Sequence, residues 1–402
     1  MEEWKEYSLS DIAKYSQGKQ IPIQLQYEEK NDSLIRFIRI VDYTSNWSQP
    51  PRYVLKDSKY HIKSDDIIMI RYGTPGKVFR GHEGLIANNM FKISVNEDII
   101  DKGFAFWYLS MDIIFKQLMS FQASTTMPAI SFGMLKNITI KVPSKKTQLK
   151  ITKIFDTIDD KIEVNRRINE QLEELAQALF KSWFVDFEPF KDGEFVESEL
   201  GMIPEGWNVG KFTDIIDIKG GGTPKTDIAE YWNGDIPFFT PKDINDVFCI
   251  STEKNITDLG LSKCSSKLYS KNTVFITARG TVGKVCMAGR DMAMNQTCYA
   301  LIGKKNFGQH FIYMQTISIV ERMKKKANGA VFSAITTRDF DSEKIIIPSL
   351  DIVNDYLMKI EPLYESILHN QQEITHLTNL RDTLLPKLMS GEIDVEQFNV
   401  IV

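Results

Sequence analysis

The chain has 402 residues and an ordinary globular composition, 43% hydrophobic and 25% charged, which leaves room for two or three domains with cores of their own. Its formal net charge of −4 gives it no general attraction for nucleic acid. No uncharged apolar stretch of about 18 residues occurs, and the acidic N-terminus is unlike a signal peptide. We therefore expect no membrane segment and a cytoplasmic protein with reduced cysteines.

Residues 1–145 predict a first body of short strands. Apolar, β-rich runs such as 66–71 are separated by Gly and Pro turns. This run leads into a glycine loop, Arg71-Tyr72-Gly73-Thr74-Pro75-Gly76-Lys77. Glycine allows the backbone to approach a phosphate closely, and Arg71 and Lys77 lie beside it, so the loop is a candidate anion-binding element.

Residues 146–190 predict the first of two long helices. Seam residues recur at steps of three and four from Ile151 to Trp183, which is typical of a coiled coil. Asn165 is a polar residue inside this seam. The helix is predicted to end in an aromatic segment, where Pro189 stops it.

Residues 200–350 repeat the plan of the first body, with a β-rich run at 272–277. Several short stretches recur in the same order, at offsets that drift only from 203 to 207. Among them are Trp4, Asp11, Ile12 and Gly18 with Trp207, Asp214, Ile215 and Gly221; Gly73–Val78 with Gly280–Val285; Asn88 with Asn295; and Val142-Pro143-Ser144 with Ile347-Pro348-Ser349. An ordered set of this kind indicates duplication.

Residues 351–392 predict the second helix, with a seam from Val353 to Leu388 and an end at Gly391. The two seams superpose at an offset of 205, which places Asn165 on Asn370. A lone polar seam residue costs stability but fixes register, so we predict a register role for both asparagines. If the helices pack antiparallel, the two amides can hydrogen-bond to each other; alternatively, each faces solvent on an irregular helix.

Charge follows the same division. Residues 1–145 hold 19 Lys+Arg against 16 Asp+Glu, residues 200–350 hold 19 against 15, and the remaining two segments hold 11 against 22. Two mildly basic bodies suit a polyanion, and acidic connecting segments suit a protein partner or solvent.

No catalytic or metal site is recognisable in the sequence. The segment Gly280–Lys284 is too short for a phosphate-binding P-loop, and Gly220–Pro224 is better interpreted as a turn. The five histidines are scattered; His369 and His376, seven apart on the second helix, favour a solvated face over a metal pair. We expect no catalytic residue, no metal and no cofactor in this chain.

Motifs in both halves resemble one known family. They are Leu384–Ile393 at the end of the second helix, Phe155–Ile162 with Asn165 and Leu179–Phe187 on the first, and Ile203–Trp207, Gly222-Thr223-Pro224 and Ile236-Pro237-Phe238 at the entrance to the second body. With them the chain resembles, over nearly its whole length, the specificity subunit of a type I restriction–modification system. The first body departs from the pattern, having Gly18-Lys19-Gln20-Ile21-Pro22 in place of Gly-Thr-Pro.

The resemblance implies an α+β fold. Two mixed α/β target-recognition domains (1–145 and 200–350) are separated by an antiparallel two-helix coiled-coil spacer (146–190 and 351–392), with an internal pseudo-twofold repeat. Each domain would read one half of a bipartite, asymmetric site in double-stranded DNA. Two methyltransferase subunits would dock on the helices, and endonuclease–translocase subunits are further implied partners. S-adenosylmethionine, ATP and magnesium would belong to those partners, and this chain would be non-catalytic.

Side-chain chemistry indicates candidate DNA-contacting residues, since Arg suits guanine, and Asn and Gln suit adenine. The candidates are Arg71, Lys77, Arg279, Thr281 and Lys284 in the glycine loops, the amide pairs Asn88-Asn89 and Asn295-Gln296, and Arg36, Arg39, Lys225 and Lys242. Turn capping is the alternative for the amides, and an exposed, solubilising charge is the alternative for the last four.

Two other classes of function remain open at this point. One is a self-contained nuclease or methyltransferase with an unfamiliar site, which S-adenosylmethionine binding by the chain alone would favour. The other is a coiled-coil scaffold whose bodies bind protein. The recognised bases, the gap between half-sites, the half that each body reads and the presence of a restriction subunit are not readable from the sequence.

Overall fold

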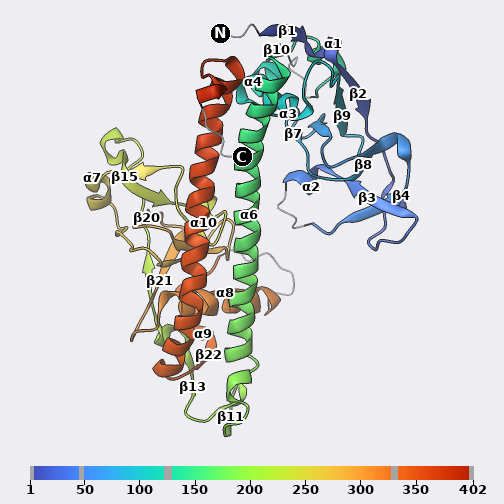
Figure 1. Ribbon diagram of the computed structural model, residues 1–402. Helices are drawn as coiled ribbons and strands as arrows, with labels where there is room; N and C mark the ends of the chain where they lie inside the picture. The colour runs from blue at the N-terminus through green and yellow to red at the C-terminus, as the bar shows by residue number, and fades with distance from the viewer. Residues whose placement is uncertain (1–3, 45–48, 122–128, 327–333, 398–402) are drawn as a thin grey trace. The chain divides into compact units, whose positions relative to one another are not determined.

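The computed structural model describes residues 4–44, 49–121, 129–326 and 334–397. The chain divides into two compact units, Met1–Lys161 with Leu377–Val402, and Ile162–His376. Each unit contains one body and part of each of the two long helices, α6 (Lys145–Phe184) and α10 (Leu350–Ser390), the long green and red ribbons of Figure 1. The helices therefore contribute to the cores of both units. The four segment boundaries drawn from the sequence stay predictions.

The body of the first unit contains two four-stranded sheets, ordered β2-β9-β6-β7 and β4-β3-β8-β5, and a separate pair β1-β10. The strands are β1 (Lys5–Ser8), β2 (Ala13–Gln17), β3 (Leu34–Ile38), β4 (Arg52–Leu55), β5 (His61–Ile62), β6 (Ile67–Ile70), β7 (Val78–Phe79), β8 (Gly84–Ile86), β9 (Met90–Val95) and β10 (Thr139–Val142). The helices are α1 (Leu9–Ile12), α2 (Ile40–Thr44), α3 (Lys102–Ser110), α4 (Asp112–Ser120) and α5 (Phe132–Leu135), with 3-10 turns η1 (Ile23–Leu25) and η2 (Ser58–Tyr60). The predicted strand at 66–71 is confirmed as β6, which is apolar on both faces and fully buried between β9 and β7.

The second unit repeats this plan with a five-stranded sheet, β14-β21-β18-β19-β16, a three-stranded sheet, β17-β15-β20, and a pair β13-β22. These strands are β13 (Asn208–Lys211), β14 (Ile216–Gly220), β15 (Trp232–Phe239), β16 (Phe248–Cys249), β17 (Asn255–Ile256), β18 (Val274–Thr277), β19 (Val285–Ala288), β20 (Ala293–Met294), β21 (Cys298–Gly303) and β22 (Lys344–Ile347). The helices are α7 (Asp258–Ser262), α8 (Gln309–Lys326) and α9 (Thr337–Ser342). A hairpin of β11 (Phe195–Ser198) and β12 (Gly201–Pro204) precedes the body, and the unit also contains 3-10 turns η3 (Glu188–Phe190), η4 (Phe212–Asp214), η5 (Ala229–Tyr231) and η6 (Pro241–Asp243). A last 3-10 turn, η7 (Val395–Gln397), belongs to the first unit. The strand predicted at 272–277 is confirmed as β18.

Strand register confirms the duplication residue by residue. Corresponding strands pair in the same direction and at equivalent positions in the two bodies. The matched pairs, first body before second, are Lys5–Val142 and Asn208–Ile347, Ile38–Ile86 and Phe239–Met294, and Ile70–Met90 and Thr277–Cys298. The bodies differ in their main helix: the first breaks between α3 and α4 at Met111, which is extended (ψ 138°), whereas α8 of the second is continuous.

The predicted helix seam is buried or half-buried along its whole length, from Ile151 to Trp183 and from Val353 to Leu388. In the second unit the helices pack antiparallel, because Asn165 donates to Glu373 whereas Asn169, further along α6, donates to the carbonyl of Ile367, earlier on α10. In the first unit Arg381 of α10 donates to Asp159 of α6. Helix α6 ends at Phe184, before Pro189, which instead lies within the 3-10 turn Glu188–Phe190 that follows the left-handed Phe187. Helix α10 ends where predicted, with Gly391 at a φ of 76°.

The prediction of a direct hydrogen bond between Asn165 and Asn370 was wrong. Asn165, 1% exposed, donates to Glu373 Oε2 at 2.6 Å, and Asn370 donates to Asn169 Oδ1 at 2.9 Å. Asn169 is a neighbouring seam position of α6, so the amides interlock one helical turn away from the predicted pair. The register role itself stays a prediction.

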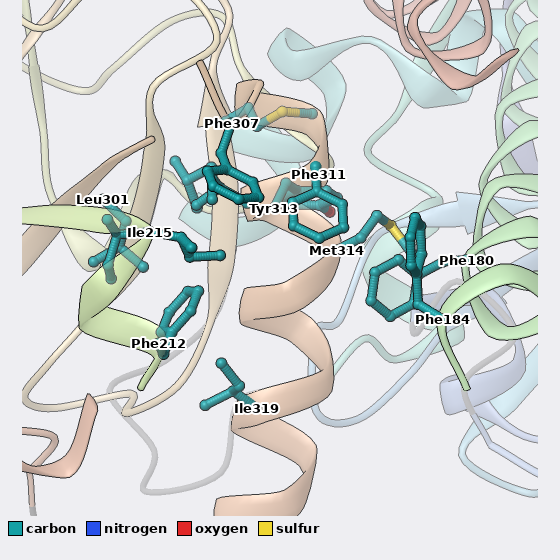
Figure 2. Close-up of a cluster of buried hydrophobic side chains, with 14 of the residues drawn as sticks. Phe180, Phe184, Phe212, Ile215, Leu301, Phe307, Phe311, Tyr313, Met314 and Ile319 are labelled. Atoms are coloured by element: carbon teal, nitrogen blue, oxygen red, sulfur yellow. The ribbon is translucent and has the colours of Figure 1, made fainter. Parts of the chain in front are cut away.

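Aromatic side chains fill the core of the second unit between the helices and the body. Phe180 and Phe184 of α6 point toward Phe311 and Met314 of α8 (Figure 2). The Phe184 ring lies 5.1 Å from that of Phe311 and 4.8 Å from that of Tyr356 on α10, both edge-on. The four cysteines are free thiols.

Candidate nucleic-acid interface

The duplicated glycine loop is a tight hairpin connection in both bodies. It joins β6 to β7 in the first and β18 to β19 in the second. Its glycines all have positive φ, which other residues rarely adopt: Gly73 94°, Gly76 89°, Gly280 80° and Gly283 76°. Lys77, Thr281 and Lys284 are exposed beside the turn. Each loop thus presents backbone and a cation to solvent, as a phosphate contact requires.

The two loop arginines are not equivalent. Tyr72 forms a bridge to Ala129 just as Arg279 does to Ala334, so Tyr72 is the counterpart of Arg279. Arg71 corresponds to Ala278 instead. Its guanidinium is half-buried and donates to Gln17 Oε1 at 2.7 Å, whereas Arg279 is exposed. Only Arg279 projects freely enough into solvent to reach a ligand without first breaking a side-chain hydrogen bond that the structure describes.

Hydrogen bonds also correct the match between the amide pairs by one residue. The Ala87 N–H donates to Ile38 O as the Asn295 N–H donates to Phe239 O. Asn295 is therefore the counterpart of Ala87, and Gln296 is the counterpart of Asn88. Equivalent residues differ by 207 in number at the glycine loop but by 208 at this turn. The second body therefore has one more residue between the loop and the turn than the first.

The side-chain amides of Asn295 and Gln296 make different hydrogen bonds. Asn295 Oδ1 accepts from both the N–H (3.1 Å) and the hydroxyl (2.9 Å) of Thr297, which makes it a turn cap, the structural alternative considered for it. Gln296 is exposed and accepts a hydrogen bond from the Thr223 hydroxyl. Asn88 and Asn89 are half-buried.

Arg36 and Arg39 are engaged in a buried ion-pair cluster. Asp42, 7% exposed, accepts from Arg39 Nε at 3.0 Å and from Arg36 Nη2 at 3.2 Å. Burial alone would raise the pKa of Asp42, but the hydrogen bonds from Arg39 and then Arg36 outweigh it and lower the pKa. Both guanidinium groups thus compensate a buried carboxylate, which is a structural task that the sequence analysis did not consider for them.

Lys225 and Lys242 are exposed, Lys225 after the Gly-Thr-Pro entrance and Lys242 in η6. A further cation escaped the sequence analysis. The side chain of Lys324, in the last turn of α8, lies against Gly283: a Cβ on that glycine would be 3.4 Å from Lys324 Cε. In the first body, the corresponding neighbours of Gly76 are Met119, Phe115 and Leu118. The basic run at 322–326 was visible in the sequence, but its closeness to the loop was not.

The described residues contain no cluster of three or more His, Cys, Asp or Glu side chains arranged to hold a metal ion. None of the helices in the described part of the chain combines the length and the apolar character that a bilayer crossing requires. His369 and His376 are both exposed on α10.

Comparison with known proteins matches the chain to one family. The model of the type I restriction modification DNA specificity domain matches residues 1–174 and again 204–379, one match for each copy of the repeat. The chain is 29% identical to the type I restriction enzyme MjaIX specificity subunit of Methanocaldococcus jannaschii, over 85% of this chain and 81% of that one. It is 28% identical to the HindI specificity subunit of Haemophilus influenzae, over 98% and 100%.

Among solved structures, the chain resembles the S subunit of the type I restriction–modification system from M. genitalium. The TM-score is 0.63 at 15% identity, and the match covers 96% of each chain. At that identity the likeness shows the fold, with its two α/β bodies and two long helices.

Proposed function

The protein belongs to the family of type I restriction modification DNA specificity domains, and we propose that it reads a bipartite, asymmetric double-stranded DNA target, one half with each body. As a specificity subunit it is a non-catalytic component of a type I restriction–modification complex. The observation that carries the proposal is the duplicated surface formed by the glycine loop and the amide turn. The backbone of this surface is the same in both bodies, but its side chains differ, with Tyr72 where the second body has Arg279. Two DNA-binding surfaces with the same backbone but different side chains suit a DNA target whose two halves have different sequences.

We further propose that two methyltransferase subunits bind the long helices. Val164, Ile168 and Leu175 of α6 are 48%, 39% and 48% exposed, and their spacings of four and seven place them on one helical face. An exposed apolar stripe of this kind is typical of a partner surface. Endonuclease–translocase subunits would join the same complex in the cytoplasm.

The chemistry of the complex is assigned to those partners. We propose that S-adenosylmethionine, ATP and magnesium are bound by partner subunits and that this chain holds no cofactor. Its own contribution is the choice of sequence.

The test is an exchange of one body. Residues 200–350 are replaced by the corresponding body of a related specificity subunit, and methylated sites are mapped after co-expression with the methyltransferase partner. We expect one half of the target to change and the other to be retained. The reciprocal exchange of residues 1–145 should change only the other half. A hybrid that assembles with its partner but alters both halves, or neither, contradicts the two-reader proposal.

A further inference from the structure

A polar pair of side chains occupies the same position in both bodies. In the first, Asn88 Nδ2 donates to Gln20 Oε1 at 3.4 Å. In the second, the Thr223 hydroxyl donates to Gln296 Oε1. The positions are equivalent, because the residues just before Gln20 and Thr223 donate their N–H groups to matching carbonyls, Lys19 to Ile86 and Gly222 to Met294. The residue types have changed, but the contact has been kept.

The backbone beneath each pair is fixed by a close approach that only glycine permits. A Cβ on Gly18 would collide with the carbonyl oxygens of Ile86 and Ala87, and a Cβ on Gly221 with those of Met294 and Asn295. The segment after β2, or β14, therefore packs directly on the turn that carries the amide. An exposed surface held this rigidly in two copies loses little conformational entropy when it binds a ligand.

Each pair adjoins its glycine loop. The residue after Asn88 accepts a backbone hydrogen bond from Arg71 (2.8 Å), and the residue after Gln296 accepts one from Ala278 (2.8 Å). A phosphate-contacting loop and an oriented amide thus stand side by side in each body. Contacts with phosphate set the position of a protein on DNA, and contacts with base edges specify the sequence.

Resting on the DNA-reading function proposed above, we propose that Asn88 and Gln296 each read an adenine, and that Gln20 and Thr223 are positioning residues that orient those amides. A carboxamide matches adenine in the major groove, where its oxygen accepts from N6 and its N–H donates to N7. Asn88 keeps its oxygen and one N–H for this purpose. Gln296 keeps both N–H groups and the second lone pair of its oxygen.

The two pairs also differ in what surrounds the amide. Gln20 adds an NH2 group with two donors, whereas Thr223 adds hydroxyl lone pairs and a methyl group. The base pair beside the adenine therefore meets different chemistry in each half. The amide and its neighbouring side chain thus provide the same adenine contact in both halves and a different contact with the next base pair in each half.

The experiment measures base discrimination by the complete complex with its methyltransferase partner. Competitor duplexes carry every single-base change of the mapped target. We expect Asn88→Ala to lower discrimination at one base pair of one half by roughly 10- to 100-fold, and Gln296→Ala to do so in the other half. Affinity for DNA of unrelated sequence should stay unchanged.

Exposed amides elsewhere in the bodies serve as matched controls, Asn137→Ala in the first and Asn245→Ala in the second. Both should discriminate as the unaltered complex does. If that complex shows no sequence preference, the proposed function fails. If the unaltered complex discriminates and either Asn88→Ala or Gln296→Ala discriminates equally well, only the present inference is overturned. The same holds if either variant loses discrimination in both halves of the target.

The orienting role has its own readout. Thr223→Ala should reduce discrimination while the preferred base stays the same, since the amide remains but its orientation is lost. Thr223→Ser keeps the hydroxyl and should restore discrimination. Wild-type discrimination in Thr223→Ala overturns the positioning role, as does failure of the serine variant to restore it.

Discussion

In the first unit a polar cluster adds to the apolar packing of the body on α6, where the Phe155 ring lies 5.4 Å from that of Trp107, whereas in the second unit aromatic rings dominate the contact. Asp156 of α6 accepts from Arg80 Nη2 at 2.6 Å and from Trp107 Nε1 at 2.7 Å. The Arg80 guanidinium also lies 4.3 Å from the centre of the Phe106 ring. In the second unit Phe180 and Phe184 of α6 are buried among the rings of Phe311 and Tyr356.

The residue that corresponds to Asp156, at the seam offset of 205, is Glu361 of α10. Its nearest basic partner is His310, with Nδ1 3.6 Å from a carboxylate oxygen. Burial lowers the pKa of His310 to about 4, so this histidine is neutral at pH 7 and gives Glu361 no ion pair. Duplication has therefore preserved the backbone positions of the attachment, while the interactions that stabilise it have diverged.

Truncation of the aromatic cluster should have the largest effect. Phe184→Ala removes a ring that is 7% exposed and leaves a cavity among Phe311 and Tyr356, which should cost about 3–5 kcal/mol. Hydrogen exchange resolved by residue, measured in increasing urea, should show this loss in the second unit. Val185→Ala, at a 53% exposed neighbour, is the matched control and should cost less than about 0.5 kcal/mol. Equal losses in both variants would contradict the attachment described here.

The polar cluster should contribute less. Asp156→Ala leaves Trp107 and Arg80 without their common acceptor, so we expect the first unit to lose about 1–3 kcal/mol. Glu361→Ala at the corresponding position should cost under about 0.5 kcal/mol, since its histidine neighbour is uncharged. Asp160→Ala, an exposed carboxylate on α6, controls for the change in helix propensity. The same exchange measurement applies, and a Glu361 loss as large as that of Asp156 would remove the distinction.

The glycine loops offer the finest comparison. The second loop has three exposed cations in or beside it, Arg279, Lys284 and Lys324, and the first has the exposed Lys77. A plot of log K for DNA binding against log salt concentration has a negative slope. Its magnitude should decrease by about 2 in the Lys284→Ala/Lys324→Ala double variant and by about 1 in Lys77→Ala. Lys267→Ala, an exposed cation of the second body, should leave the slope unchanged. Equal slopes for all three variants would place the loops outside the interface.

Much of this architecture was readable from the sequence, because it depends on local periodicity. The seam from Ile151 to Trp183 and the buried strands β6 and β18 follow from spacing alone. The sequence also holds the signal that explains Arg39, since Asp42 stands three residues later and accepts both its side chain and its backbone N–H. This spacing favours an internal ion pair for Arg39 over a contact with DNA.

Other features depend on which distant segments meet. The partner of Asn165 is Glu373, more than 200 residues away, and the packing of the two helices selects it over Asn370. The counterpart of Asn88 is Gln296, which strand hydrogen bonds identify although simple alignment pointed to Asn295. An error of one residue is enough to exchange an exposed amide for a turn cap.

The sequence by itself determined that the chain is a duplicated pair of basic bodies with two seamed helices, since repeats and periodicities are properties of residue order. Tertiary structure alone decided which side chains are available to DNA. Arg36 and Arg39 are committed to Asp42, Asn295 is committed to its own turn, and Lys324 is brought beside Gly283. The physical reason is that a polar group's availability depends on the partners that folding places within hydrogen-bond reach, and those partners come from segments far apart in the chain.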